Sequence, residues 1–210
     1  MKHAYLEYYG LIFALVIGFT WFLYPQLPPV MVTHWGLFGQ ANGWMAKSMG
    51  AWIIPLILGI VWLIWEAAPL TLEEYDNETF YPPYRLLGLF VFLFLGTIHF
   101  IALGINLGWH IDLLKALSWL FVVFAAILGQ LLPITPKNPI MGIRTPWSMK
   151  SKGVWRKTHK EAGRWFRAAS LVDIIFLLTL SRPWGFLAVI SSFIVCLLLG
   201  VWFSYVYRRY

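Results

Sequence analysis

The sequence predicts an all-α fold: a polytopic membrane helix bundle of six transmembrane helices, with an amphipathic helix at the cytoplasmic interface. The first observation is composition, because 60% of the 210 residues are hydrophobic and only 12% are charged, whereas soluble proteins carry roughly 25% charged residues. The second is that the apolar residues gather in long runs, and the third is the uneven placement of Lys and Arg. This composition excludes a disordered, collagen-like, coiled-coil or nucleic-acid-binding chain. The single cysteine, Cys196, excludes a disulfide framework.

Six apolar runs are long enough to cross a bilayer, which takes about 20 residues of helix. They must be helical, because unpaired backbone polar groups are not tolerated in hydrocarbon. The first run is longer than a signal-peptide core and no cleavage site follows it, so we predict a retained span. The chain is therefore one membrane domain, 1–210, with spans at 6–24, 49–68, 86–107, 113–132, 165–180 and 183–207.

The net charge of +7 indicates topology, because cytoplasmic loops of membrane proteins are enriched in Lys and Arg. In a six-span chain the two termini share one side with the second and fourth loops. Thirteen of the 16 Lys and Arg residues fall on that side, and the other three are Lys47, Lys115 and Arg182. The bias places both termini and the long fourth loop in the cytoplasm.

The first loop, at residues 25–48 on the outer side, is rich in proline and glycine, which indicates turns and not helix. Gly39 and Gly43 permit positive φ at tight reversals. His34, together with His110 and Asp112 of the third loop, offers three possible zinc ligands. Their spacing matches no recognised metal motif, so we predict no metal and no cofactor, and we interpret His34 as a hydrogen-bonded loop residue.

The cytoplasmic segment 133–167 combines an irregular loop with an amphipathic helix, for which Ser151 is a suitable N-cap. At about 100° per residue, a set of mostly apolar side chains falls within an arc of roughly 120°, with His159 at its edge and charged residues on the opposite face. The arc contains Val154, Trp155, Thr158, Ala162, Trp165, Phe166 and Ala169. This pattern is typical of a helix that lies in the membrane interface, and it leads directly into the fifth span. Anchoring is the favoured role, and docking of anionic lipid or a soluble partner is the alternative.

Three ionisable residues need separate interpretation. Arg144 lies between Gly142 and Pro146, where no regular helix can form. It either pins the loop to the helix bundle through backbone carbonyls or clamps a carboxylate, a lipid phosphate or an internal partner such as Asp173. Asp173 is the one clear acid within a span, and an ion pair with an arginine is favoured over a proton relay. His99, inside the third span, indicates an interhelical hydrogen bond.

Two loop motifs are more informative about the family than composition or hydrophobicity. The first loop contains Pro25, Pro28, His34, Trp35, Gly39, Gly43, Trp44 and Lys47. The fourth loop contains Asn138, Gly142, Ile143, Arg144, Thr145, Pro146, Trp147 and Ser148, followed by Trp155. These segments resemble the SdpI-like immunity family, whose members show P-x-x-P…H-W…G…G-W after the first span and N-x-x-x-G-[IL]-R-T-P-W-[ST] after the fourth. With the length and the six-span plan, the resemblance covers nearly the whole chain.

The resemblance implies a multi-pass protein of the bacterial cell membrane that protects its producer against a secreted, membrane-active toxin peptide. It also implies a cytoplasmic partner, a transcriptional repressor held at the membrane. The outer-loop residues expected to bind are His34, Trp35, Gly39, Gly43, Trp44 and Lys47. The cytoplasmic ones are Asn138, Gly142, Arg144, Thr145, Pro146, Trp147, Trp155 and His159.

Membrane lipid is the other expected partner, and direct contact with nucleic acid is not expected. No enzyme motif is recognised, so catalysis is not the favoured interpretation. The alternative function is a membrane enzyme or small transporter acting on a lipid or peptide, with His34, Arg144 and Asp173 as its reactive groups.

Overall fold

A computed structural model describes residues 4–68 and 77–209. These residues form two compact units. Unit 1 lies within Met1–Leu70 and Gly88–Leu117, and unit 2 lies within Thr71–Leu87 and Ser118–Tyr210. Two of the three boundaries between the units fall inside helices, between Leu87 and Gly88 and between Leu117 and Ser118.

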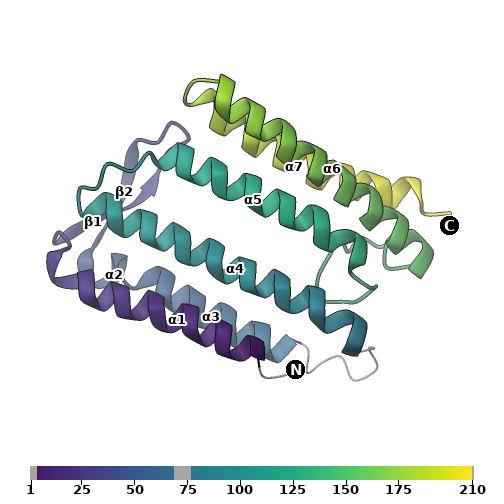
Figure 1. Cartoon of the computed structure of the whole chain (residues 1–210), viewed down its shortest axis with the longest axis horizontal. Coiled ribbons are helices and arrows are strands. Elements are labelled where there is room, and N and C mark those ends of the chain that lie inside the picture. Colours follow the sequence, from purple (N-terminus) through teal and green to yellow (C-terminus); the bar gives the residue numbers. More distant parts are fainter. Residues whose placement is uncertain (1–3, 69–76, 210) are drawn as a thin grey trace. The chain divides into compact units, whose positions relative to one another are not determined.

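The helices confirm the all-α membrane bundle (Figure 1). They are α1 (Ala4–Leu23), the short 3-10 helix η1 (Tyr24–Gln26), α2 (Lys47–Gly50), α3 (Ile53–Ala67), α4 (Asn77–Asn106), α5 (Leu113–Ile134), α6 (Lys152–Thr179) and α7 (Trp184–Val206). Five segments of the described chain are long and apolar enough to cross a membrane, namely Tyr8–Gln26, Lys47–Ala67, Thr79–Asn106, Leu113–Ile134 and Trp184–Val206. The predicted fifth span, 165–180, is the second half of α6, whose first half carries the basic residues.

Helix α4 begins at Asn77, well before the predicted start of the third span at residue 86. The sequence places Pro82 and Pro83 in between, and proline usually marks the start or end of a helix because it lacks the backbone N–H. Both prolines nevertheless lie inside α4. They lie in the second turn, beyond the first four N–H groups that have no intrahelical partner, so each removes one backbone hydrogen bond of the helix.

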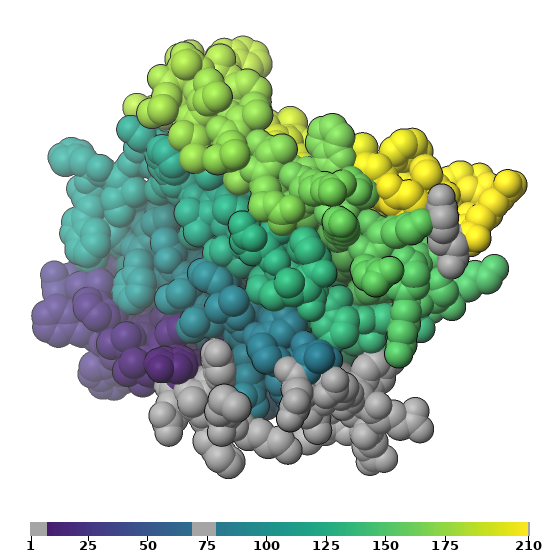
Figure 2. Space-filling model, turned by 45° about the vertical axis from the view of Figure 1, so that its right-hand side comes forward, coloured from purple at the N-terminus to yellow at the C-terminus, as the bar shows by residue number. Residues whose placement is uncertain are grey.

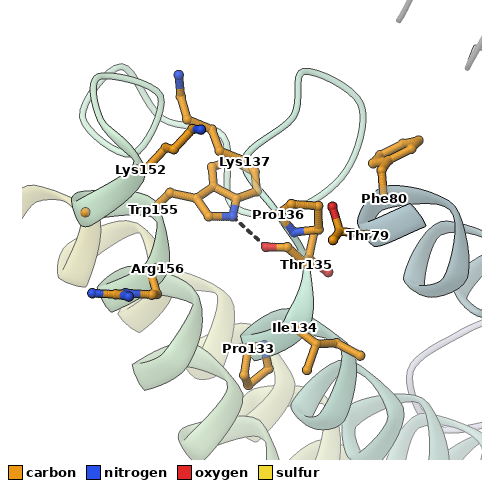
Figure 3. A pocket seen from close by; sticks show the side chains of 11 residues that line it. Thr79, Phe80, Pro133, Ile134, Thr135, Pro136, Lys137, Lys152, Trp155 and Arg156 are labelled. Carbon is orange, nitrogen blue, oxygen red and sulfur yellow. Dashed lines mark hydrogen bonds between the residues drawn. The ribbon is translucent and has the colours of Figure 1, made fainter. Parts of the chain in front are cut away.

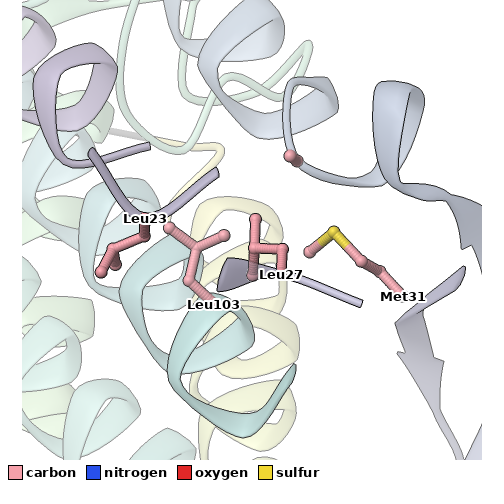
Figure 4. Close-up of a cluster of buried hydrophobic side chains, with 5 residues drawn as sticks. Leu23, Leu27, Met31 and Leu103 are labelled. Carbon is pink, nitrogen blue, oxygen red and sulfur yellow. The ribbon is translucent and has the colours of Figure 1, made fainter. Parts of the chain in front are cut away.

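The first loop contains structure that the sequence analysis did not predict. Strands β1 (Val30–Trp35) and β2 (Ala41–Ala46) pair antiparallel, with Met31 opposite Met45 and His34 opposite Gly43. The prediction of turns holds only for the reversal between the strands, where Gly39 has φ +81°. Beneath the hairpin, five side chains from the loop and its flanking helices form a buried cluster, as Figure 4 shows for four of them: Leu23, Leu27, Met31, Ala51 and Leu103.

Unit 2 is organised around α6, which packs along α7 (Figure 1). The green surface of α6 and the yellow surface of α7 adjoin on the face seen in Figure 2. Helix α6 is continuous from its N-cap, where the Ser151 hydroxyl accepts from the Val154 N–H, to Thr179. The amphipathic segment therefore leads directly into the predicted fifth span.

The apolar face of α6 was expected to face lipid at the membrane interface, but much of it packs inside the protein. Ala162 and Phe166 are buried together with Ala125, Leu132 and Cys196 inside unit 2. Trp165, placed on the same arc by periodicity, is instead 47% exposed. The apolar face of the first half of α6 is thus a packing face, and the surface left open at residues 152–164 is mainly basic. In the second half the exposed side chains are apolar, among them Leu171, Ile175 and Leu178.

Candidate functional site

The first-loop motif builds the hairpin. His34 lies opposite Gly43, and a Cβ at position 43 would come within 2.8 Å of the His34 Cβ, so only glycine fits there. The His34 Nδ1 lies 2.5 Å from the Asn42 Oδ1 across the hairpin. This agrees with the interpretation of His34 as a hydrogen-bonded loop residue, although its side chain is exposed.

The hairpin is attached to α4 through Asn106, a residue that the sequence analysis missed. The Asn106 side chain accepts from the Val32 N–H (2.7 Å) and donates to the Val32 carbonyl (2.9 Å) and to the Ala102 carbonyl (2.9 Å). It thereby satisfies both backbone groups of Val32 on the edge of β1. A lone amide at the end of an apolar run was the only sequence signal.

Lys47 closes the other end of the hairpin. Its ammonium donates to the Leu27 carbonyl (3.1 Å) and lies 4.6 Å from the centre of the Tyr24 ring, and its backbone N–H donates to the Pro29 carbonyl. Lys47 is therefore a structural residue. The hairpin also has side chains that make no such structural contact with the rest of the loop. Four large apolar ones are exposed: Val30, Leu37, Phe38 and Trp44.

A small cavity of about 170 Å³ lies in unit 1 under the hairpin, lined in part by Trp35, Met45 and His99. His99 is buried, and its Nε2 lies 2.7 Å from the Thr20 hydroxyl, which donates to the Val16 carbonyl. The bond joins α1 to α4, so the predicted interhelical hydrogen bond of His99 is present in the structure.

In unit 2 the fourth-loop motif forms a compact, hydrogen-bonded segment. Asn138 is fully buried, and its carbonyl oxygen accepts from the N–H groups of Ile140 and Met141, both at 2.8 Å. Its amide donates to the carbonyls of Pro136 (2.8 Å) and Met141 (3.2 Å). All four hydrogen-bonding positions of this side chain therefore serve the loop itself.

The loop is then held against α6. Gly142 has φ +113°, and a Cβ there would lie 2.5 Å from the His159 Nε2 and 2.9 Å from the Trp155 ring. His159 accepts from the Ile143 N–H at 3.0 Å and its Nδ1 donates to the Trp155 carbonyl. Burial lowers the pKa of His159 to about 4, so the imidazole is neutral at pH 7. Its ring stacks on Trp155, whose indole N–H donates to the Thr135 carbonyl at 2.8 Å.

A second attachment joins the loop to α7. Thr145 and Ser148 bond each other's backbone N–H groups, as in a capping box. The Thr145 hydroxyl also donates to Ser204 of α7 at 2.8 Å. Trp147 contacts Tyr205 edge-on with ring centres 5.1 Å apart, and Pro146 is exposed. Ser204 lies in the last span and gave no sequence signal beyond a small polar residue in an apolar run.

Arg144 is exposed, and its guanidinium donates to the Pro139 carbonyl. The partner is a backbone carbonyl, as expected, but it belongs to the loop itself, so this contact does not pin the loop to the helix bundle. Asp173 is 1% exposed and has a hydrogen bond from the Ser192 side chain, while its Oδ1 has no partner. Among the described residues no arginine pairs with Asp173. The expected Asp173–arginine pair is therefore wrong, and the guanidinium of Arg144 bonds to the backbone of its own loop instead.

Three residues were considered as possible zinc ligands, although no metal was predicted: His34, His110 and Asp112. Across the part of the chain that the structure describes, no three His, Cys, Asp or Glu side chains gather in a group that could hold an ion. The three residues are therefore not brought together.

Beside the fourth loop lies the cationic pocket, a cavity of about 820 Å³ (Figure 3). Its walls come from the start of α4, the end of α5 with the residues that follow, and the first turns of α6. The lining residues are Thr79, Phe80, Pro133, Ile134, Thr135, Pro136, Lys137, Lys152, Gly153, Trp155 and Arg156. The pocket gives no signal in the sequence, because its three cations resemble the basic residues that set topology in any cytoplasmic loop.

Comparison with known proteins agrees with the motifs. Residues 134–206 match the SdpI/YfhL protein family, and residues 11–59 match a domain of unknown function, DUF1648. The chain is 24% identical over 143 residues to the immunity protein SdpI of Bacillus subtilis (strain 168). That match covers 68% of this chain and 66% of the relative, slightly less than two thirds of its length. No solved structure matches the chain.

Proposed function

We infer from this SdpI-like character that the chain is a bacterial membrane immunity protein, which protects its cell against a secreted, membrane-active toxin peptide. The family match and the relative's name carry the coarse part of this proposal. Toxin recognition is the finer part, and the apolar surface of the hairpin carries it.

The hairpin surface is unusual for its position in the chain. Val30, Leu37, Phe38 and Trp44 are all exposed, with Trp44 at 57%. They lie between the segments Tyr8–Gln26 and Lys47–Ala67, the first two candidate spans, so lipid hydrocarbon does not account for their exposure. Exposed apolar patches outside a membrane core mark interaction sites. An amphipathic peptide offers a complementary apolar face.

The orientation is part of the same proposal. The excess of Lys and Arg assigns both termini and the fourth loop to the cytoplasm, which leaves the hairpin outside, where a secreted peptide arrives. Reporter fusions test this: a fluorescent protein at the C-terminus should fold and fluoresce, and alkaline phosphatase at the hairpin should be active. The opposite pair of results contradicts the orientation.

The decisive experiment is survival of a peptide-sensitive bacterium that expresses the chain. We expect protection by the wild type and weaker protection by Trp44→Ala, because the substitution removes the largest exposed ring of the hairpin. Trp202→Ala is the matched control, since Trp202 is 54% exposed on α7. Unchanged killing by a panel of membrane-active peptides, with the wild type well expressed in the membrane, would contradict the immunity proposal.

A cytoplasmic repressor is the second proposed partner, and the exposed basic face of α6 is the surface offered to it. Lys160 and Arg164 are exposed there, outside the cationic pocket. A fluorescent fusion of a repressor encoded beside the gene should move to the membrane when toxin is added. Lys160→Glu should reduce this movement while survival stays unchanged. Movement that is independent of this chain would remove the repressor from the proposal.

A further inference from the structure

The cationic pocket has the size and charge of a ligand site. Its volume of about 820 Å³ falls in the range of small-molecule sites, roughly 300–1,000 Å³. Three cations line it: Lys137, Lys152 and Arg156. Among the described residues of its lining there is no Asp or Glu, and none of the three cations has a hydrogen bond or ion pair with the described part of the chain.

The three cations of the pocket come from two elements. Lys137 follows α5, whereas Lys152 and Arg156 belong to the start of α6. In Figure 3 the side chains of Lys137 and Lys152 extend beside Trp155, while Arg156 extends away from Thr135. Trp155 is fixed by its hydrogen bond to the Thr135 carbonyl. The two lysines therefore lie beside a ring that is held in place by a buried hydrogen bond.

The pocket also has a defined level with respect to the bilayer. Thr79 is the first residue of one candidate span and Ile134 is the last residue of another, and both line the pocket. Ends of spans lie where hydrocarbon gives way to lipid headgroups. Pro133 and Ile134 add apolar surface next to the cations. Basic pockets between transmembrane helices at this level are suited to phospholipid headgroups.

We propose that the cationic pocket binds the phosphodiester headgroup of an anionic phospholipid. Lys137 and Lys152 contact the phosphate oxygens, and Pro133 and Ile134 contact the glycerol and the first acyl carbons. A soluble phosphate ester shares the phosphate chemistry but not the apolar part. The site does not depend on the immunity function or on the side of the membrane that the fourth loop faces, because headgroups occupy both leaflets.

Native mass spectrometry of the full chain in a non-ionic detergent tests the proposal. Phosphatidylglycerol and phosphatidylcholine are titrated separately, and glycerol 3-phosphate is the soluble probe. We expect the wild type to bind phosphatidylglycerol at least about tenfold more tightly than phosphatidylcholine. Lys137→Gln/Lys152→Gln should weaken phosphatidylglycerol binding by roughly 30-fold, because each basic side chain near a membrane surface contributes about a factor of five.

Lys160→Gln is the matched control, since Lys160 is an exposed cation of α6 outside the pocket, and it should bind phosphatidylglycerol as the wild type does. Equal affinity of the wild type for the two lipids would overturn the proposal, and so would an equal loss in the double variant and in Lys160→Gln. Binding of glycerol 3-phosphate without any preference for phosphatidylglycerol would overturn the lipid assignment. The comparison of lipids on the wild type needs no variant, so it holds even if the double variant folds poorly.

Discussion

Replacement of Gly142 by alanine tests whether the fourth-loop motif is a structural attachment. The backbone at φ +113° disfavours any side chain, which costs about 1–2 kcal/mol. The new Cβ would also lie 2.5 Å from the His159 Nε2 and displace the acceptor of the Ile143 N–H. Leaving buried partners unsatisfied costs about 1–3 kcal/mol. The expected loss is therefore about 2–5 kcal/mol, or a Tm lower by roughly 10 °C on the scaling for chains of this size.

Two other glycines separate the backbone cost from the cost of the contact with His159. Gly108 has φ +79° but nothing near its Cβ position, so Gly108→Ala should show only the backbone cost. Gly18 has an open Cβ position and lies within α1, so Gly18→Ala should not lower Tm. The assay is thermal unfolding in one detergent, followed by tryptophan fluorescence. If Gly142→Ala were no less stable than Gly108→Ala, the attachment of the loop to His159 would not be the reason for glycine at this position.

Three further predictions concern single contacts. The pKa of His159 falls from 6.5 to about 4 on folding, so the native state binds fewer protons than the unfolded state. The free energy of unfolding should therefore decrease as the pH is lowered from 6.5 to 4, by about 2 kcal/mol at pH 5. In a series of Tm measurements against pH, His159→Gln should flatten this dependence, and an unchanged slope would refute the assignment. Asn138→Asp keeps the acceptor oxygen but loses the amide that donates to Pro136 and Met141, so its Tm should fall by several degrees at pH 7, whereas a wild-type Tm would show that the donors contribute little. Asn106→Ala removes both hydrogen bonds that attach Val32 of the hairpin to α4, so limited proteolysis should cut within residues 30–46 faster with the fourth loop unaffected. Equal cleavage at both loops would point to general unfolding instead.

The parts of the fold that could be predicted are those that depend on neighbours in sequence. The apolar runs predicted the helices because the transfer of a continuous apolar segment into lipid is a local property. Ser151 was recognised as an N-cap because its acceptor reaches an N–H only three residues away. The hairpin was missed because proline and glycine obscure its alternation, and because Asn106, which holds β1, lies 74 residues from Val32.

The candidate site likewise has features that could be predicted from nearby residues and features that could not. The motif identified Asn138 and Gly142, and helical periodicity placed His159 at the edge of the apolar arc. Neither pattern showed that the polar groups of Asn138 and His159 are satisfied within the protein. The cationic pocket could not be predicted, because its walls come from segments separated by tens of residues.

The sequence by itself determined a multi-pass membrane protein with two informative loops, since hydrophobic length and residue order need no partner. The tertiary structure alone decided which motif residues hold the loops, such as Gly43 and Gly142, and which side chains remain available, such as Trp44 and Lys137. The reason is physical: whether a polar atom is satisfied or an apolar side chain is covered depends on groups that only folding brings close.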